Sequence, residues 1–266
     1  MKILSWVNLV ISLLFMICYA YQAVYLAFSL FRKPKIFPKG KLHRYGVLIA
    51  ARNEEAVIGN LIDSVNKQDY PSELVDIFVV ADNCTDRTAE VARQAGAAVY
   101  SRMNRQQVGK GYALNHLLGQ IAREAGGLRR FDAFLVFDAD NLLQPDFVTR
   151  INETCSDGYE AFCGYRNSKN FGDNWISAGN SMWFLRDSQF LNRARMKLRT
   201  SCIVAGTGFL VHRDVLKESG GWKYHLITED TQFTVCQMLK GEKIGYCETA
   251  VFYDEQPVSF KIAMRQ

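Results

Sequence analysis

The chain has 266 residues, of which 48% are hydrophobic and 22% charged, enough for one large domain or two small ones. This composition excludes an intrinsically disordered chain, a collagen-like repeat and a small disulfide-stabilised protein. The 32 lysines and arginines outnumber the 27 aspartates and glutamates, giving a net charge of +5. Such an excess of positive charge is common in nucleic-acid-binding proteins, but here the charge is not spread evenly along the chain.

The first predicted element is a membrane-spanning helix over residues 1–31. From Ile3 to Phe31 the sequence carries no charged residue. As a helix this segment would be about 43 Å long at ~1.5 Å per residue, whereas a bilayer core is about 30 Å thick. A cleavable signal peptide has an apolar core of only about 7–15 residues, followed by a site of small residues. The segment is longer and lacks that site, so we expect a single transmembrane anchor.

A basic linker follows over residues 32–44. Its cations, with no acidic residue among them, are Arg32, Lys33, Lys35, Lys39, Lys41 and Arg44. Since only Lys2 and the amino terminus precede the anchor, the positive-inside rule places the chain from residue 32 onward in the cytoplasm, at the plasma membrane. The linker would lie against anionic lipids. The rest of the chain is slightly acidic and has no basic stripe with interleaved aromatic residues, so we expect a lipid bilayer and no nucleic acid as a partner.

Short apolar runs alternate with helical patterns after the linker. The predicted strands cover residues 46–51, 75–81, 97–100 and 132–137, and the predicted helices cover residues 54–67, 86–95 and 111–125. This alternation indicates an α/β domain with a mostly parallel sheet, extending over residues 45–266. From residue 159 onward the alternation is less regular, which indicates mixed α+β structure, with helices over Trp175–Arg195.

Carboxylates follow the predicted strands, at the sheet edge where ligands of parallel sheets bind. Asp138 and Asp140 come directly after the strand over 132–137. Residues two apart in an extended segment point to the same side, and two hard carboxylates suit a divalent cation such as Mg²⁺ or Mn²⁺ that carries a diphosphate. The alternative is a solvated turn, because turns are rich in aspartate. The position after a buried strand favours the metal site.

Three other segments carry candidate functional groups. Asp82 ends an otherwise apolar strand and can accept hydrogen bonds from a nucleobase or ribose, or cap the next helix. Lys110 stands between two glycines where a helix begins, a position suited to a phosphate, although a flexible loop explains it as well. Residues 206–208 (Gly-Thr-Gly) form either a turn or a loop under a ligand. In Thr228-Glu229-Asp230 one acid can be a general base, or the acids merely begin a helix.

Taken together and in order, these segments resemble the family 2 glycosyltransferases with the GT-A fold, a Rossmann-like, mostly parallel sheet followed by an α+β acceptor half. Membrane-bound cellulose, hyaluronan and poly-N-acetylglucosamine synthases belong to that family. The resemblance extends from about Tyr45 to Gln266. It rests on the segments at residues 50–54, 80–86, 110–115, 138–140, 206–208 and 228–230.

The resemblance implies a nucleotide-sugar half over residues 45–140 and an acceptor half over residues 141–266. In the first half it implies that Arg52, Asn53, Glu54 and Asp82 hold the uridine of a UDP-sugar. Lys110 would lie near the diphosphate, Asp138 would contact the nucleotide-sugar, and Asp140 would ligate Mg²⁺ or Mn²⁺.

In the acceptor half the resemblance implies that Gly206, Thr207, Gly208 and Glu229 face a glycan or lipid-linked acceptor. Asp230 would be the catalytic base. It would remove the proton from an acceptor hydroxyl, which attacks the anomeric carbon while UDP departs with metal assistance, inverting the configuration.

The synthases carry a later Gln-x-x-Arg-Trp motif that closes over donor and acceptor. Here the chain ends at Gln266, which would be the first residue of that motif. The alternative to an active enzyme is therefore a catalytically incomplete fragment or a non-catalytic membrane scaffold. A scaffold predicts lost carboxylates, yet Asp82, Asp138, Asp140 and Asp230 are all present. A haloacid-type phosphatase and a sugar nucleotidyltransferase are disfavoured, because Leu142 and the glycine-free loop after the first strand do not match their motifs.

Overall fold

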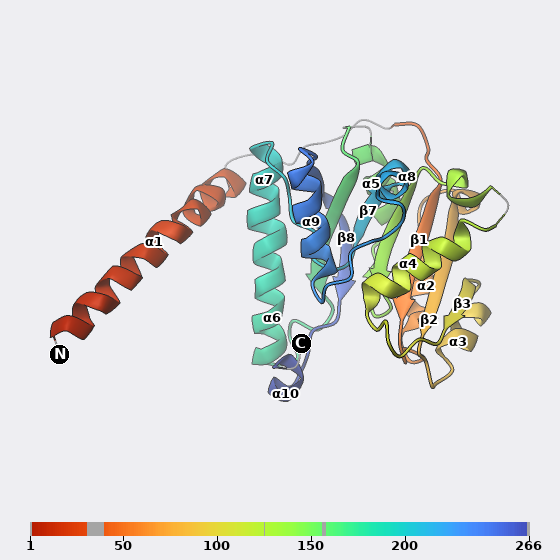
Figure 1. Cartoon of the computed structure of the whole chain (residues 1–266), viewed down its shortest axis with the longest axis horizontal. Coiled ribbons are helices and arrows are strands. Elements are labelled where there is room, and N and C mark those ends of the chain that lie inside the picture. Colours follow the sequence, from red (N-terminus) through yellow and green to blue (C-terminus); the bar gives the residue numbers. More distant parts are fainter. Residues whose placement is uncertain (1, 31–39, 125, 156–157, 265–266) are drawn as a thin grey trace.

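The computed structural model describes residues 2–30, 40–124, 126–155 and 158–264. Its first element is helix α1 (Lys2–Leu30), which projects away from an α/β domain (Figure 1). The most apolar 18-residue stretch within Ile3–Leu30 has a mean hydropathy of 2.2, and none of that stretch is buried. The predicted apolar helix is therefore confirmed as a candidate membrane span. Of the expected linker, only residues 40–44 lie among those described.

The C-terminal end of α1 rests against the domain. It contacts a π-helical segment, η3 (Arg186–Asn192), and the short helix α7 (Arg193–Lys197) that follows. The Lys197 Nζ donates to the Ser29 carbonyl at 3.4 Å, and the Arg195 guanidinium lies 5.7 Å from the centre of the Tyr25 ring. The candidate anchor is thus attached to the second half of the domain.

The domain is built on one eight-stranded sheet, with the strand order β3-β2-β1-β4-β7-β6-β8-β5. The first half contributes four parallel strands: β1 (Tyr45–Ala51), β2 (Val75–Asp82), β3 (Ala98–Arg102) and β4 (Ala133–Asp138). The second half contributes β5 (Leu142–Leu143), β6 (Ala161–Ser168), β7 (Phe209–His212) and β8 (Ile244–Asp254). β7 is antiparallel to both β4 and β6, and β5 is antiparallel to β8. The predicted mostly parallel sheet with a mixed second half is confirmed.

Helices cover both faces of the sheet and make two cores. Successive strand residues point to opposite faces, so that Val47 and Ile49 enter one core and Leu48 the other. The first core lies under α2 (Ile58–Asn66), α3 (Thr88–Gln94) and α5 (Phe147–Cys155). The second lies under α4 (Lys110–Ile121), α8 (Arg213–Ser219) and α9 (Glu229–Leu239), with Trp222 fully buried in it. Burial on both faces explains the nearly continuous apolar runs of β1, β2 and β4.

The helical region over Trp175–Arg195 is confirmed, but it is not one regular helix. Helix α6 (Trp175–Leu185) passes into η3 before α7 begins. The remaining elements are the 3-10 turns η1 (Ser72–Leu74) and η2 (Gly127–Arg130) and the short helix α10 (Phe260–Ala263). In Figure 1, α6, α9 and α10 lie on the side of the domain from which α1 departs.

Two predicted helices begin later than expected. α2 starts at Ile58 rather than at Glu54, because the Glu54 amide donates to the Thr88 hydroxyl at 2.8 Å and its carbonyl closes a turn. α3 starts at Thr88 rather than at Asp86, whose carboxylate accepts a hydrogen bond from the Thr88 amide at 3.0 Å. The residues that precede these later helix starts, 54–57 and 86–87, form loops at the carboxyl edge of the sheet.

Candidate functional site

The carboxyl ends of β1, β2 and β4 meet at one edge of the sheet. Ala50 of β1 stands opposite Asp138 of β4, and Ala51 stands opposite Ala81 of β2. Arg52, Asp82 and Asp140 therefore emerge at the same edge, as expected for a parallel sheet.

The loop after β1 is joined to the loop after β2. The Asn53 Oδ1 accepts a hydrogen bond from the Thr85 amide at 2.8 Å, and Asn53 itself has a φ of 58°. This strained conformation is one that asparagine tolerates better than most residues. Asn53 thus shapes the loop, while the side chain of Arg52 is exposed beside it. Burial raises the pKa of Glu54, and the charges of Asp138, Asp86 and Glu255 add to the effect.

Asp82 is almost fully buried and already has a charged partner. Its Oδ1 accepts a hydrogen bond from the Arg102 Nη1 at 2.5 Å, and Arg102 also donates to the Gln107 carbonyl at 2.7 Å. Arg102 in turn lines an open pocket of about 410 Å³. The other residues of this pocket are Ser101, Met103, Asn104, Gln107, Tyr112, Asn115, His116 and His225. Of these residues, only Tyr112 and Asn115 lie in a segment selected from the sequence, the one at 110–115. Arg102 matches no motif, because it meets Asp82 only through the pairing of β2 with β3.

Lys110 bridges two parts of the site. As the first residue of α4 it pairs with the Asp138 carboxylate and donates to the Gly206 carbonyl at 2.7 Å. The next residue, Gly111, has to be glycine, because a Cβ there would lie 1.9 Å from the Tyr224 carbonyl oxygen. This close approach brings the segment before α9 to the start of α4.

Asp138 and Asp140 form the centre of the site, and their chemistry fits a divalent cation. Burial raises the pKa of Asp140 to about 7, and the charges of Asp254 and Asp138 contribute. A bound cation would compensate this concentration of negative charge. Among the described residues there is no group of three or more His, Cys, Asp or Glu side chains with metal-binding geometry. The residues present thus suit a cation that takes its remaining oxygen ligands from a diphosphate and water, as Mg²⁺ does.

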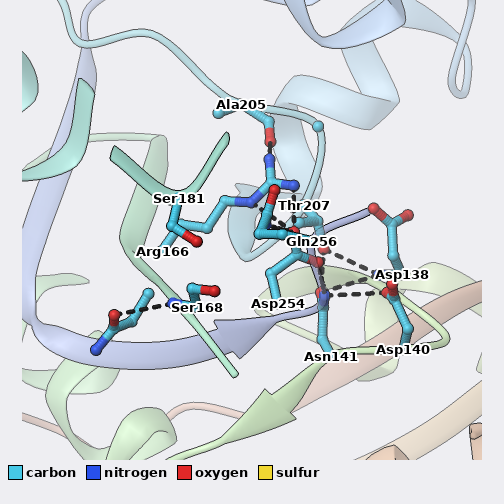
Figure 2. Close-up of polar contacts among 12 residues, drawn as sticks. Asp138, Asp140, Asn141, Arg166, Ser168, Ser181, Ala205, Thr207, Asp254 and Gln256 are labelled. Atoms are coloured by element: carbon cyan, nitrogen blue, oxygen red, sulfur yellow. Dashed lines mark hydrogen bonds and ion pairs between the residues drawn. The ribbon is translucent and has the colours of Figure 1, made fainter. Parts of the chain in front are cut away.

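A buried polar network lies next to these carboxylates (Figure 2). Asp254, at the end of β8, accepts hydrogen bonds from Asn141 and Arg166, and Asn141 accepts one from Thr207. Sequence reasoning selected Thr207 but missed the other three, since an isolated Asn, Arg or Asp at a strand end matches no motif.

Two acids of α9 complete the site from the opposite side. Glu229 is buried, which raises its pKa, and the positive charge of Lys110 partly opposes the increase. Asp230 is more accessible, and its Oδ1 accepts a hydrogen bond from the Thr231 amide at 2.7 Å. Its Oδ2 lies 3.6 Å from the point where a Cβ on Gly206 would be. A carboxylate therefore stands beside the Gly206 backbone, whose carbonyl binds Lys110.

The structure thus gathers many of the predicted site residues into one cluster, consisting of Lys110, Asp138, Asp140, Gly206, Thr207, Glu229 and Asp230. Glu54 borders this cluster, while Asn53 serves the loop and Asp82 is covered by Arg102. Gly208 is a structural glycine, since a Cβ there would lie 2.0 Å from the Phe252 ring. Gln266 lies outside the described residues.

Known proteins with similar sequences are glycosyltransferases. A beta-monoglucosyldiacylglycerol synthase of Synechocystis sp. is 30% identical over 207 residues, which cover 75% of this chain and 41% of the synthase. The probable glycosyltransferase YdaM of Bacillus subtilis is 25% identical over 248 residues, covering 85% of this chain and 54% of YdaM. The chain thus spans about half the length of these two relatives.

Solved structures show the same fold. The mannosyltransferase PcManGT of Pyrobaculum calidifontis, in complex with GDP-Man and Mn²⁺, aligns with a TM-score of 0.66 at 18% identity, over 92% of this chain and 66% of that one. The S. aureus protein TarS (residues 1–349), in complex with UDP-GlcNAc, aligns with a TM-score of 0.59 at 17% identity, over 83% and 60% of the two chains. The sheet and its covering helices are therefore of the GT-A type.

The family model described as "Glycosyltransferase like family 2" matches residues 43–266, which is the entire α/β domain described above. The resemblance drawn from the ordered segments is confirmed: the chain belongs to glycosyltransferase family 2.

Proposed function

We propose that the chain is a membrane-anchored, metal-dependent, inverting glycosyltransferase that moves a sugar from a UDP-sugar to a lipid-linked or glycan acceptor. One observation carries the proposal. At the carboxyl edge of the sheet, Lys110 joins the Asp138 carboxylate to the Gly206 carbonyl, the charge of Asp138 acts on Asp140, and the Asp230 carboxylate lies beside Gly206. The Lys110 ammonium group and the carboxylates of Asp138 and Asp140 suit the departure of a diphosphate. The separate carboxylate of Asp230 suits the activation of an incoming hydroxyl.

The donor side would be formed by residues 45–140. Arg52, Asn53 and Glu54 border the nucleotide, and Asp82 supports that wall through Arg102 rather than by direct exposure. Asp138 and Asp140 would hold Mg²⁺ or Mn²⁺, which supplies charge compensation for the departing diphosphate. Lys110 would move from Asp138 toward the phosphate oxygens, because its ammonium group is a natural phosphate ligand.

The acceptor side would be formed by residues 141–266. The Asp230 carboxylate takes the proton of an acceptor hydroxyl, and that oxygen forms the new bond to the anomeric carbon. The bond from the anomeric carbon to the UDP oxygen breaks on the opposite face, so the configuration inverts and UDP leaves with the electron pair. Gly206, Thr207, Gly208 and Glu229 would shape the floor under the acceptor.

The relatives and α1 support the proposed acceptor class and location. The Synechocystis relative is named for a diacylglycerol product, and other relatives from Staphylococcus aureus are named 4,4'-diaponeurosporenoate glycosyltransferases, 33% identical over 139 residues. An acceptor dissolved in a bilayer also suits a domain attached to an apolar helix. We place α1 in the plasma membrane and the domain in the cytoplasm, as the basic residues after the helix indicate.

The proposal is tested by nucleotide release. The chain is reconstituted in nanodiscs and supplied with Mn²⁺ or Mg²⁺, a panel of UDP-sugars, GDP-mannose as a comparison, and diacylglycerol or a glycan as acceptor. We expect UDP release with at least one UDP-sugar, increased by an acceptor and abolished by EDTA. If no donor gives metal-dependent release, the alternative of a catalytically incomplete fragment or silent scaffold is correct.

A further inference from the structure

The carboxylate of Asp254 is buried beside the site, yet no step proposed above uses it. Only 3% of its surface is exposed. Its Oδ1 accepts a hydrogen bond from the Asn141 Nδ2 at 2.7 Å, while its Oδ2 accepts from the Arg166 Nε at 3.1 Å and the Gln256 Nε2 at 2.8 Å. A buried carboxylate with this many donors is a fixed point of the structure, because any other position of the carboxylate would break at least one of these hydrogen bonds.

The first consequence of this fixed point concerns Asn141, directly after the Asp138–Asp140 turn. A carboxylate only accepts hydrogen bonds, so the Asn141 amide turns its NH₂ group toward Asp254 at 2.7 Å, and the same group donates to the Asp140 Oδ1 at 3.3 Å. Its Oδ1 is thereby directed at the opposite side, where it accepts from the Thr207 hydroxyl and from the Asp138 amide at 3.2 Å. The Asp138 amide also donates to the Thr207 Oγ1 at 2.9 Å. Asp254 thus sets the orientation of the amide that holds the turn.

The second consequence concerns Arg166, which lies between Asp254 and the loop at 206–208. Its Nη2 also bonds to Asp254, and its Nη1 donates to the Ala205 carbonyl at 3.0 Å. The guanidinium is stacked on the ring of Phe184 at 3.6 Å from its centre, under helix α6. Because arginine donates in a rigid planar fork, fixing one side of the guanidinium at Asp254 fixes the donor to Ala205 as well.

We infer that Asp254 is a positioning residue for the divalent-cation site. Through Asn141 it fixes the Asp138–Asp140 turn, and through Arg166 it fixes Ala205 at the start of the 206–208 loop (Figure 2). The Gly206 carbonyl of that loop accepts a hydrogen bond from Lys110. The inference rests on the proposed function, since it takes Asp138 and Asp140 as the cation-binding carboxylates. Residues that hold metal ligands in place through hydrogen bonds orient those ligands, and their loss costs about 10–100-fold in metal affinity.

The polarity of the Asn141–Asp254 hydrogen bond supplies a specific test. Asn141→Asp places two carboxylates face to face where a donor met an acceptor, so the turn loses its support. Asp254→Asn in the same chain restores one donor and one acceptor across that contact. The new carboxylate at position 141 can still accept from Thr207 and from the Asp138 amide. A role in positioning therefore predicts partial rescue, whereas mere damage to the fold predicts that two changes are worse than one.

The readout is Mn²⁺ binding in the presence of UDP, measured by the electron paramagnetic resonance signal of free Mn²⁺, without turnover. We expect Asn141→Asp to weaken binding about 10–100-fold, and the double variant to recover at least part of that loss. Hydrogen exchange of metal-free protein provides a second readout. Exchange of peptides covering 138–141 and 205–208 should be faster in Asn141→Asp and slower again in the double variant. Asn60→Asp, on the exposed face of α2, is the matched control and should leave both readouts unchanged.

Thr207→Val keeps the shape of the side chain, removes the hydroxyl between Asn141 and the Asp138 amide, and provides a variant if Asn141→Asp does not fold. It should weaken Mn²⁺ binding as well. The inference is overturned if Asn141→Asp, or Thr207→Val in its place, binds Mn²⁺ as the parent does, or if the double variant is no better than Asn141→Asp. A parent chain that binds no Mn²⁺ with UDP would instead refute the proposed function and the inference with it.

Discussion

The imidazole of His225 stacks on the phenol ring of Tyr112, with the ring centres 4.2 Å apart and 5° between the planes. Tyr112 lies two residues after Lys110 in α4, while His225 precedes Glu229 and Asp230 on the segment that enters α9. The stack therefore joins the donor side of the site to the element that carries the proposed base.

Loss of this stack should loosen the segment before α9. Aromatic pairs contribute about 0.5–1.5 kcal/mol beyond their buried area, so Tyr112→Ala should lower the melting temperature by a few degrees and speed hydrogen exchange over residues 222–229. Tyr112→Phe retains a ring and should behave as the parent does. Equal exchange in the Ala and Phe variants would show that the stack does not hold this segment.

Replacement of the proposed base should remove catalysis without removing the donor. Asp230→Asn keeps the shape of the side chain but accepts no proton, and general base catalysis contributes about 10²–10⁴-fold. We expect kcat for sugar transfer to fall by at least about 100-fold, with the dissociation constant of UDP within about twofold of the parent, measured by calorimetry. Asp63→Asn, on the exposed surface of α2, is the control. A kcat within tenfold of the parent would assign the base to another group.

The raised pKa of Asp140 predicts a pH-dependent stability in the metal-free protein. Asp140 titrates near 7 in the folded chain and near 4 when unfolded, so the folded state holds this proton more tightly. The carboxylate therefore costs little stability below pH 4, an increasing amount from pH 4 to 7, and a constant amount above pH 7. At about 1.36 kcal/mol per pKa unit, the upper limit is on the order of 4 kcal/mol.

Asp140→Asn removes this cost. Melting temperatures measured in EDTA should therefore rise on substitution by several degrees at pH 8 and by clearly less at pH 5. Adding Mn²⁺ with UDP at pH 8 should stabilise the parent and not the variant. An equal gain at pH 5 and pH 8 would mean that the Asp140 carboxyl does not titrate in this range.

Two glycines of α4 should respond oppositely to the same substitution. A Cβ at Gly111 would lie 1.9 Å from a backbone oxygen, which cannot move away without displacing the segment before α9. Gly111→Ala should therefore destabilise the protein by about 3 kcal/mol or more. Gly119 has nothing within 4 Å of such a Cβ, so Gly119→Ala should stabilise the helix by about 0.5–1 kcal/mol. Thermal melts of both variants in nanodiscs compare the two, and a stable Gly111→Ala protein would contradict the close approach.

The first half of the fold was predictable because each strand is a short apolar run. Val47 to Ile49 are buried on both faces of the sheet, and such runs are recognisable without knowing their partners. Helix starts were less accurate, because the Glu54 amide donates to Thr88 and the Asp86 carboxylate accepts from the Glu55 amide, so that both groups join two loops instead of beginning helices. That choice depends on β1 and β2 being neighbours, which local sequence does not encode.

The site was predictable where the residues lie in ordered motifs, as for Lys110, Asp138 and Asp230. Arg102, Arg166 and Asp254 were missed, because each is isolated in the sequence and gains its partner only through the sheet. The pairing of Asp82 with Arg102 was not predictable either, and it is the reason for proposing that Asp82 supports the nucleotide site rather than contacting the nucleotide. The π-helical turn at 186–192 was likewise not predictable, since its residues have ordinary helix-forming composition.

The strand order has a consequence for how the protein is made. β4 has β7 as a neighbour, and β6 lies between β7 and β8. The free edge of β4 is therefore covered only by strands that are synthesised much later. Such non-local pairing is slow to form. During translation the first four strands would emerge with one edge open and with Asp138 unsupported until residue 254 has left the ribosome. A nascent chain that stalls before that point would therefore expose an unpaired sheet edge, of the kind that promotes aggregation, before the proposed cation site is complete.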